Sequence, residues 1–279
     1  MTTALTALKR YGLGVLAIAV SIVVFIIPLL FMVLTAVKDR KEAAKLDFAW
    51  PTSFQFVENF TAVLSARKFM LVTAFINSTI LTVVSVTILV ILAAMVAWVL
   101  QRRKSRWNGV ANFLILSGLI IPPAIVPTIW VLQGMGLFKT LPGLILIEVA
   151  FGLSFCVMLF RAFIASIPKE LDEAAVIDGC GPVRLFFRVI FPLLRSVIVT
   201  VIVVQSVHIF NDFQNPLYFL PGDANATVQL TLFNFQSQFT TNYNLLFMNI
   251  LLITVPPFIM YLFFNRQIVA GMTAGAVKG

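Results

Sequence analysis

The sequence predicts an all-α integral membrane protein with six transmembrane helices. Of its residues, 60% are hydrophobic and only 11% are charged, whereas soluble domains carry about 25% charged residues. The mean hydropathy is +1.01. Uncharged runs at 12–37, 70–101 and 107–138 each exceed the ~20 apolar residues that a helix needs to cross hydrocarbon. These long unbroken runs exclude a membrane barrel, whose strands would alternate in polarity.

Six spans are expected within a single transmembrane domain that covers 1–279. They are 12–37, 72–100, 110–134, 142–164, 193–218 and 244–264. The first run is longer than a signal-peptide core, so it is expected to stay as an anchor. Prolines fall inside three of the spans: Pro28, Pro122, Pro123, Pro127, Pro256 and Pro257. Each removes a backbone donor and is expected to bend or break its helix.

Lys and Arg residues set the orientation of such a protein. With the N-terminus inside, the inner segments hold thirteen of them and the outer segments seven, which favours N-in and C-in. Six of the seven outer ones lie between 38 and 68, so the first outer loop is an exception. The basic residues that give the net charge of +9 lie mostly in loops between the spans, where they set the orientation. No nucleic-acid partner is therefore expected.

The inner loop 165–192, between the fourth and fifth spans, is predicted to form two short helices. Pro168 suits a first helical turn, and the acidic residues that follow favour the positive end of the helix dipole. Gly179 suits a left-handed turn, Pro182 can open the second helix, and Pro192 interrupts it. On physical grounds alone, an amphipathic helix lying at the lipid headgroups is an open alternative for this loop.

Three pieces of this loop resemble the Glu-Ala-Ala loop of bacterial binding-protein-dependent ABC importer permeases. They are Glu173-Ala174-Ala175, Asp178-Gly179, and Ile190 with Pro192. The resemblance implies a cytoplasmic pair of coupling helices that docks on an ATPase subunit. Glu173 would pair with a basic ATPase residue, and Gly179 would permit the turn. The expected coupling residues are Glu173, Ala174, Ala175, Asp178, Gly179 and Arg184.

Four other segments are similar to the smaller membrane subunit of maltose and glycerol-phosphate importers, so that the resemblance covers about 13–279. They are Asn77-Ser78, Gly136-Leu137 with Thr140, Asn211-Asp212 with Asn215-Pro216-Leu217, and 271–279. Phe210 and Phe191 depart from the family's usual tryptophan and leucine, which leaves the solute open. In this family the C-terminal tail, 265–279 here, reaches between the ATPases. The residues expected to do so are Thr273, Gly275 and Lys278.

The resemblance also implies the partners. They are a homologous second permease subunit, two ATPase subunits, an extracytoplasmic solute-binding protein, a small carbohydrate, and the lipid of the bacterial cytoplasmic membrane. No cofactor is expected on this chain, because ATP and Mg would bind the ATPase subunits. The sequence itself has no Gly-x-x-x-x-Gly-Lys-Ser/Thr phosphate loop and no catalytic or zinc spacing, so no enzyme activity is expected.

Several polar residues fall within or beside the spans. Those expected to line the solute path or contact the partner subunit are Asn77, Asn211, Asp212, Gln214 and Asn215. Glu148 is expected near the outer headgroups, and His208 to bond between helices rather than to a metal. An ion-coupled secondary transporter and a membrane scaffold remain alternative functions. The first would need deep charges and inverted repeats.

Overall fold

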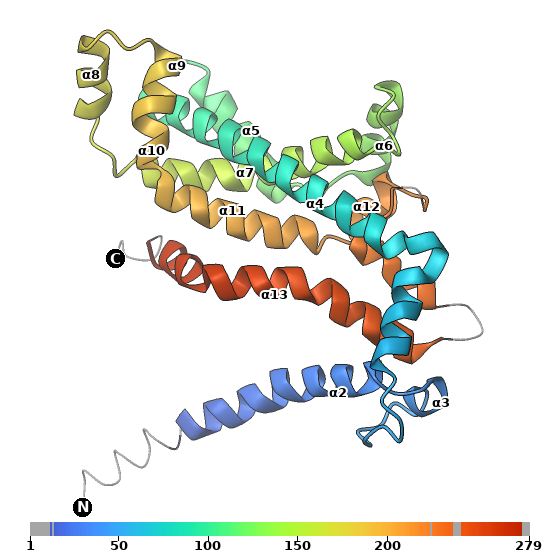
Figure 1. The fold of residues 1–279 in the computed structure, drawn as a ribbon. Coiled ribbons are helices and arrows are strands. Elements are labelled where there is room, and N and C mark those ends of the chain that lie inside the picture. The colour runs from blue at the N-terminus through green and yellow to red at the C-terminus, as the bar shows by residue number, and fades with distance from the viewer. Residues whose placement is uncertain (1–11, 13, 224, 237–240, 275–279) are drawn as a thin grey trace, which may run out of the picture. The chain divides into compact units, whose positions relative to one another are not determined.

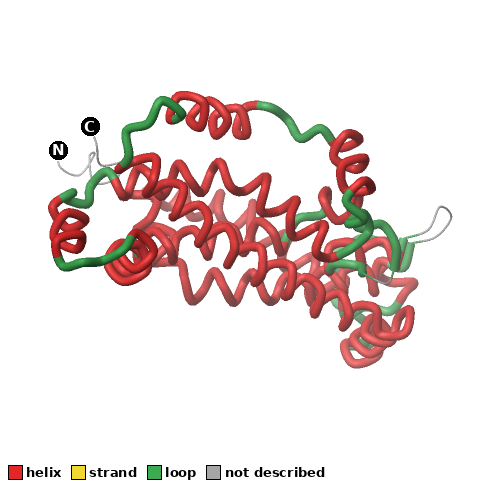
Figure 2. Tube along the Cα trace, turned by 90° about the horizontal axis from the view of Figure 1, so that it is seen from above, coloured by secondary structure: helices red, strands yellow, loops and turns green. Residues whose placement is uncertain are grey.

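The computed structural model describes residues 12, 14–223, 225–236 and 241–274. Within them the chain forms helices and loops and no strand (Figure 2). It divides into two compact units, Met1–Leu71 with Thr231–Val255, and Val72–Leu230 with Pro256–Gly279. This division, which cuts across α4 (Phe56–Arg102) and α13 (Tyr243–Ala274), was not foreseen from the sequence.

The first unit begins with an apolar helix that has few neighbours. The π turn η1 (Ile22–Ile26) leads into α2 (Ile27–Ala36), and residues 14–30 are exposed throughout. The π turn precedes Pro28, and the Ile27 amide there bonds five residues back to the Ile22 carbonyl. Water would not solvate so long an apolar surface, so this surface faces lipid or another chain.

Polar contacts fasten the loop after α2 to the rest of this unit. The buried Lys38 ammonium lies 2.7 Å from both the backbone carbonyl and the carboxylate of Asp47, and this hydrogen bond lowers the pKa of Asp47. The Asn59 amide donates to the carbonyl of Ala36 (2.8 Å) and accepts from Asn244 (2.8 Å). The loop, α2, α4 and α13 are therefore joined by buried hydrogen bonds. The short helix α3 (Arg40–Ala43) lies in this loop.

The second unit holds most of the remaining helices (Figure 1). They are α5 (Asn108–Ile120), α6 (Ile125–Gly134), α7 (Leu141–Ile164), α8 (Glu170–Ile177), α9 (Pro182–Leu185), η2 (Phe186–Ile190), α10 (Phe191–Leu193), α11 (Arg195–Phe210) and α12 (Gln214–Phe219). The 3-10 helix η3 (Val228–Phe235) crosses from this unit into the first. Figure 1 shows α8 and α9 at one end of α7 and α11, and α12 at the other.

The core of the second unit lies between α4, α7, η2 and α11. Ala93 and Ala97 of α4, Phe160 of α7 and Val201 of α11 are fully buried in it. Small residues bring the helices together, because a Cβ at Gly152 of α7 would lie 2.9 Å from a methyl group of Leu89 on α4. Close packing therefore depends on the absence of a side chain at 152.

Four predicted spans correspond to single helices long and apolar enough to cross a membrane. They are Gly14–Ala36, Phe56–Arg102, Leu141–Ile164 and Tyr243–Phe264. Arg67, Lys68 and Phe69 break the helical backbone of α4, ahead of the predicted start of the span at 72. The helix α13 continues without a break through Pro256 and Pro257, although a bend or a break is expected there from the sequence.

The spans predicted over 110–134 and 193–218 are not single helices, and the break expected at the prolines of the third span is present. The third span is divided into α5 and α6, which are bent by 118° at Pro122 and Pro123. The fifth begins at Arg195, after a 78° bend, and stops at Phe210 before the separate α12. The structure thus has up to six spans if each bent pair counts as one.

Gly143 gives a test of the packing at the start of α7. An alanine Cβ there would collide with the carbonyl oxygen of Leu137, and the backbone cannot turn away as a side chain would. Gly143→Ala is expected to destabilise the protein by about 1–3 kcal/mol, measured by thermal unfolding in detergent. Gly134→Ala is the control, since a Cβ there has no atom within 4 Å. Equal stabilities of the two variants would contradict this packing.

Candidate functional site

The loop 165–192 forms the two short helices that its sequence predicts. Helix α8 carries Glu170, Asp172 and Glu173 in its first turn, where carboxylates favour the helix dipole. The chain then turns at Gly179, whose φ of +79° is the left-handed conformation that glycine adopts without strain. Pro182 opens α9, which continues through the π turn η2 into α10. We call residues 168–193 the knob.

Most of the predicted coupling residues lie on the knob's exposed surface. Glu173, Ala174, Asp178, Gly179 and Arg184 are exposed. Ala175 differs, because it is buried at 7% exposure and packs inside the chain. Apolar side chains share this exposed surface: Leu171 (42%), Val176 (60%), Ile177 (85%) and Val183 (67%). Exposed apolar residues among charges are typical of a surface that binds another protein.

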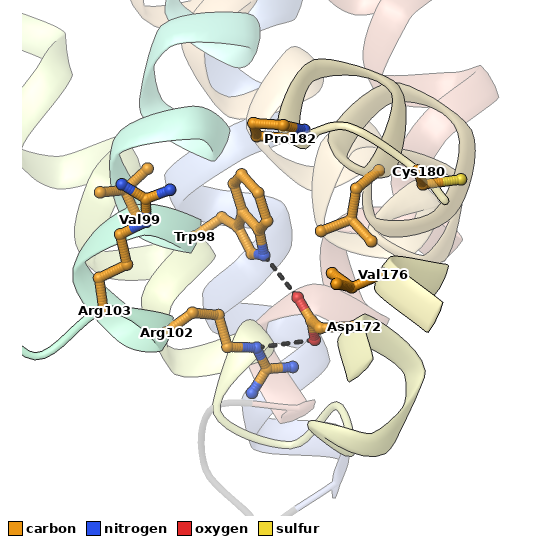
Figure 3. Close-up of a pocket in the computed structure, with 9 residues that line it drawn as sticks. Trp98, Val99, Arg102, Arg103, Asp172, Val176, Cys180 and Pro182 are labelled. Atoms are coloured by element: carbon orange, nitrogen blue, oxygen red, sulfur yellow. Dashed lines mark hydrogen bonds and ion pairs between the residues drawn. The ribbon is translucent and has the colours of Figure 1, made fainter. Parts of the chain in front are cut away.

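The knob is attached to the end of α4 by a contact that the sequence did not predict. The Trp98 indole N–H donates to Asp172 Oδ1 at 2.8 Å, and Arg102 Nε lies 3.0 Å from Asp172 Oδ2 (Figure 3). The Arg102 guanidinium also donates to the carbonyls of Ile167 (2.9 Å) and Pro168 (3.4 Å). Trp98 and Arg102 are four residues apart, so they lie on one face of α4.

A cavity of about 320 Å³ lies beside this contact. Figure 3 shows Trp98 and Arg102 on one side of it and the helices of the knob on the other. Its walls include Val99, Val176, Pro182 and Leu185. Next to Asp172, the knob and α4 therefore enclose open space between them.

The polar residues predicted in the fifth span gather at the break after α11. The Asp212 carboxylate accepts from the backbone amides of Gln214 (2.9 Å) and Asn215 (3.3 Å), and Asn211 accepts from Gln229 (3.3 Å). The Asn215 amide donates to Glu148 at 3.2 Å. Asn211, Asp212 and Asn215 thus satisfy the backbone and side chains at this break, whereas Gln214 is exposed.

Glu148 and Asn77 have different surroundings. The Glu148 side chain is buried inside the chain, at 3% exposure, and its expected depth near the outer headgroups stays a prediction. Asn77 lies apart from the cluster at 211–215. Its amide donates to the Ala226 carbonyl (3.1 Å), and the neighbouring Ser78 hydroxyl accepts from the Val228 amide (3.0 Å).

A second cavity of about 300 Å³ lies between α7 and α11. Its lining combines polar and aromatic side chains: Glu148, Phe151, Gly152, Phe155, Val204, Gln205 and His208. Gln205 is 5% exposed, and its buried Oε1 accepts no hydrogen bond from the described residues. Such an atom is ready to accept one from a ligand.

The sequence held a signal for this cavity that was missed. Glu148, Phe151, Gly152 and Phe155 follow at helical spacing on one face of α7. Gln205 and His208 do the same on α11, with a separation of three residues. Taken together, these two helix faces predict the polar and aromatic lining of the cavity between α7 and α11.

The C-terminal tail is only partly described. Thr273 lies in the last turn of α13. Gly275 and Lys278 lie outside the described residues.

Comparisons with known proteins agree on one family. Residues 75–273 match the model of the binding-protein-dependent transport system inner membrane component. The chain is 31% identical to the melibiose/raffinose/stachyose import permease protein MelC of Bacillus subtilis, over 91% of each chain. It is also 31% identical to AmyC of Thermoanaerobacterium thermosulfurigenes, a probable starch degradation products transport system permease protein, over 97% of each.

The fold matches a solved structure as well. That structure is a bacterial ABC transporter involved in the import of the acidic polysaccharide alginate, with a TM-score of 0.78 at 18% identity. The match covers 95% of this chain and 96% of the other. Because the two sequences are only 18% identical, this match shows a shared fold and nothing more.

The two glycines around Cys180 give a matched pair of variants. Gly179 has a φ of +79°, whereas Gly181 has a φ of −68°, and a Cβ at either position has no atom within 4 Å. Gly179→Ala should therefore destabilise the turn by about 1–2 kcal/mol, purely through backbone strain. Gly181→Ala should not. Faster hydrogen exchange across 174–185 in the first variant alone is the expected result, and equal exchange in both would disprove the strained turn.

Proposed function

We propose that this chain, which belongs to the family of binding-protein-dependent transport system inner membrane components, is the permease subunit of a bacterial ABC importer for sugars. It is a multi-pass protein of the inner membrane. One relative is named a melibiose/raffinose/stachyose import permease, and another a probable starch degradation products transport system permease. These names support a small carbohydrate as the solute. The energy would come from two separate ATPase subunits that bind ATP and Mg.

The proposed topology has six spans with both termini in the cytoplasm. Basic residues support it, because nine of the ten Lys and Arg residues between 72 and 230 lie at the knob end of the second unit. They are Arg102, Arg103, Lys104, Arg106, Arg161, Lys169, Arg184, Arg188 and Arg195. The tenth, Lys139, contacts Phe219 and Asn225 near α12. Under the positive-inside rule, this distribution supports a cytoplasmic knob.

The knob is proposed to dock on an ATPase subunit. The observation that carries this proposal is its exposed surface, where Glu173 and Asp178 lie among apolar residues such as the 85% exposed Ile177. Glu173 would pair with a basic ATPase residue, Ala174 would allow close approach, and Arg184 would contact the ATPase from α9. The tail residues Thr273, Gly275 and Lys278 would reach between the two ATPase copies.

Two further partners are proposed on the membrane side. The exposed apolar helix over 14–30 supports contact with a homologous second permease subunit as well as lipid. An extracytoplasmic solute-binding protein, as the family's description implies, would deliver the sugar. The two permease subunits would enclose the solute path between them.

The cavity between α7 and α11 is proposed as this chain's part of that path. Glu148, Gln205 and His208 offer hydrogen bonds for sugar hydroxyls, and Phe151 and Phe155 offer ring faces for the apolar side of a sugar. Such a mixture is typical of carbohydrate sites. The cluster at Asn211 and Asn215, next to Glu148, would continue the path toward the outside.

Glu173→Lys tests the docking. Reversing the charge should lower ATP-driven uptake by at least about tenfold, because a broken interfacial charge pair leaves its partner unsatisfied. Uptake is measured in proteoliposomes that contain the assembled importer and its binding protein. Glu58→Lys, the same reversal at an exposed site on α4 in the first unit, should leave uptake unchanged. Wild-type uptake with normal ATPase docking in Glu173→Lys would refute the proposal.

The same vesicles separate the proposal from its alternatives. An importer requires ATP and continues to work after an ionophore collapses the ion gradients. An ion-coupled transporter would show the reverse dependence, and a scaffold would show no solute flux.

Gln205→Leu tests the cavity. Losing the amide should lower uptake at subsaturating sugar by about tenfold, the factor for one lost hydrogen bond to a bound ligand. Basal ATP hydrolysis should not change. Ser206→Ala is the control, because the adjacent Ser206 lines a different, apolar cavity with Val83 and Val90. Equal uptake by both variants would remove the cavity from the path.

A further inference from the structure

One side chain of α8 makes polar contacts with α4. Within the part of the chain that the structure describes, these contacts belong to Asp172, which meets Trp98 at 2.8 Å and Arg102 at 3.0 Å (Figure 3). Both charged side chains are largely withdrawn from solvent, at 10% exposure for Arg102 and 15% for Asp172. Their attraction is therefore screened less than that of a surface pair.

The same two residues of α4 also hold the neighbouring parts of the knob. Arg102 bonds to the carbonyls of Ile167 and Pro168, where the chain enters α8. The Trp98 ring lies 5.6 Å from the ring of Phe186, in the second helix of the knob. One turn of α4 thus contacts the entry to the knob, its first helix and its second helix.

The cavity of about 320 Å³ beside the Asp172 contact makes this contact important for transmitting movement from α8 to α4. Val99 of α4 and Val176 of α8 line this space. Side chains packed across it would transmit a push over a broad area. Across this open space, the described polar contact of α8 with the end of α4 is the one between Asp172 and its two donors.

Adjacent residues on α8 face in different directions. Successive positions on a helix are about 100° apart, so Asp172 can face α4 while Glu173 remains exposed. The far side of the connection is α4 itself, which is helical from the start of the second unit to Arg102. Its Leu89 packs against Gly152, which lines the cavity between α7 and α11.

We propose that Asp172 is the positioning residue that transmits the movement of α8 to α4, and through Leu89 to the wall of the cavity between α7 and α11. This inference rests on the proposed docking of the knob on an ATPase. It assigns different tasks to neighbouring carboxylates: Glu173 receives the force from outside the chain, and Asp172 passes it inward. Trp98 and Arg102 are the residues that receive it on α4.

The test measures sugar molecules imported per ATP hydrolysed, in proteoliposomes with the assembled importer. Asp172→Asn keeps an acceptor for Trp98 but removes the charge that Arg102 meets. Trp98→Phe removes the indole donor and keeps a ring beside Phe186. Each variant should assemble and hydrolyse ATP, and import per ATP should fall by about tenfold, the factor for one lost hydrogen bond to a charged group.

Two further variants sharpen the test. Glu170→Gln loses a carboxylate from the same first turn of α8, where Glu170 is exposed, and should match the wild type. Asp172→Glu keeps the charge and should recover at least half of the wild-type ratio. A purely structural role for Asp172 would lower the yield or melting temperature of the complex and leave the ratio unchanged in complexes that form.

An unchanged ratio in both Asp172→Asn and Trp98→Phe would overturn the inference. If Glu173→Lys still abolishes uptake in that case, the docking of the knob stands and only the task of Asp172 is refuted. If Glu173→Lys is also normal, the proposed function itself has failed.

Discussion

Hydrocarbon offers no hydrogen-bond partner to a peptide group, and this constraint governs where the chain leaves the helical conformation. Ahead of Pro28 and of Pro192 the backbone forms a π turn, in which an amide bonds five residues back. At 211–213 the Asp212 carboxylate accepts the next free amides. These three departures from helix are thus compensated locally, and the last of them is where the chain of this permease gathers polar side chains.

The second unit has two chemically different ends. Basic residues and the knob are at one end, and the cluster of Asn211, Asp212 and Asn215 is near the other. Between them α4, α7 and α11 share an apolar core that excludes water. Closely packed helices move as rigid bodies, so a small displacement at one end is carried to the other rather than absorbed on the way.

Local rules predicted part of this structure well. Apolar length predicted the helices that are long enough to cross a membrane. The glycine at 179 predicted a left-handed turn, and its φ is positive in the structure. The break before α12 was missed although Pro216, which has no amide to continue α11, is its local signal. The contact of Asp172 with Trp98 could not be predicted in the same way, because 74 residues separate the two and only the packing of α4 against the knob brings them together.

The uncovered surface of the first helix has a consequence for biogenesis. Over 14–30 no described residue is buried by the rest of its own polypeptide. Lipid can hold this segment across the bilayer, but only association with another protein gives it a fixed neighbour. A copy made in excess of the proposed second subunit would therefore keep this helix exposed to lipid alone.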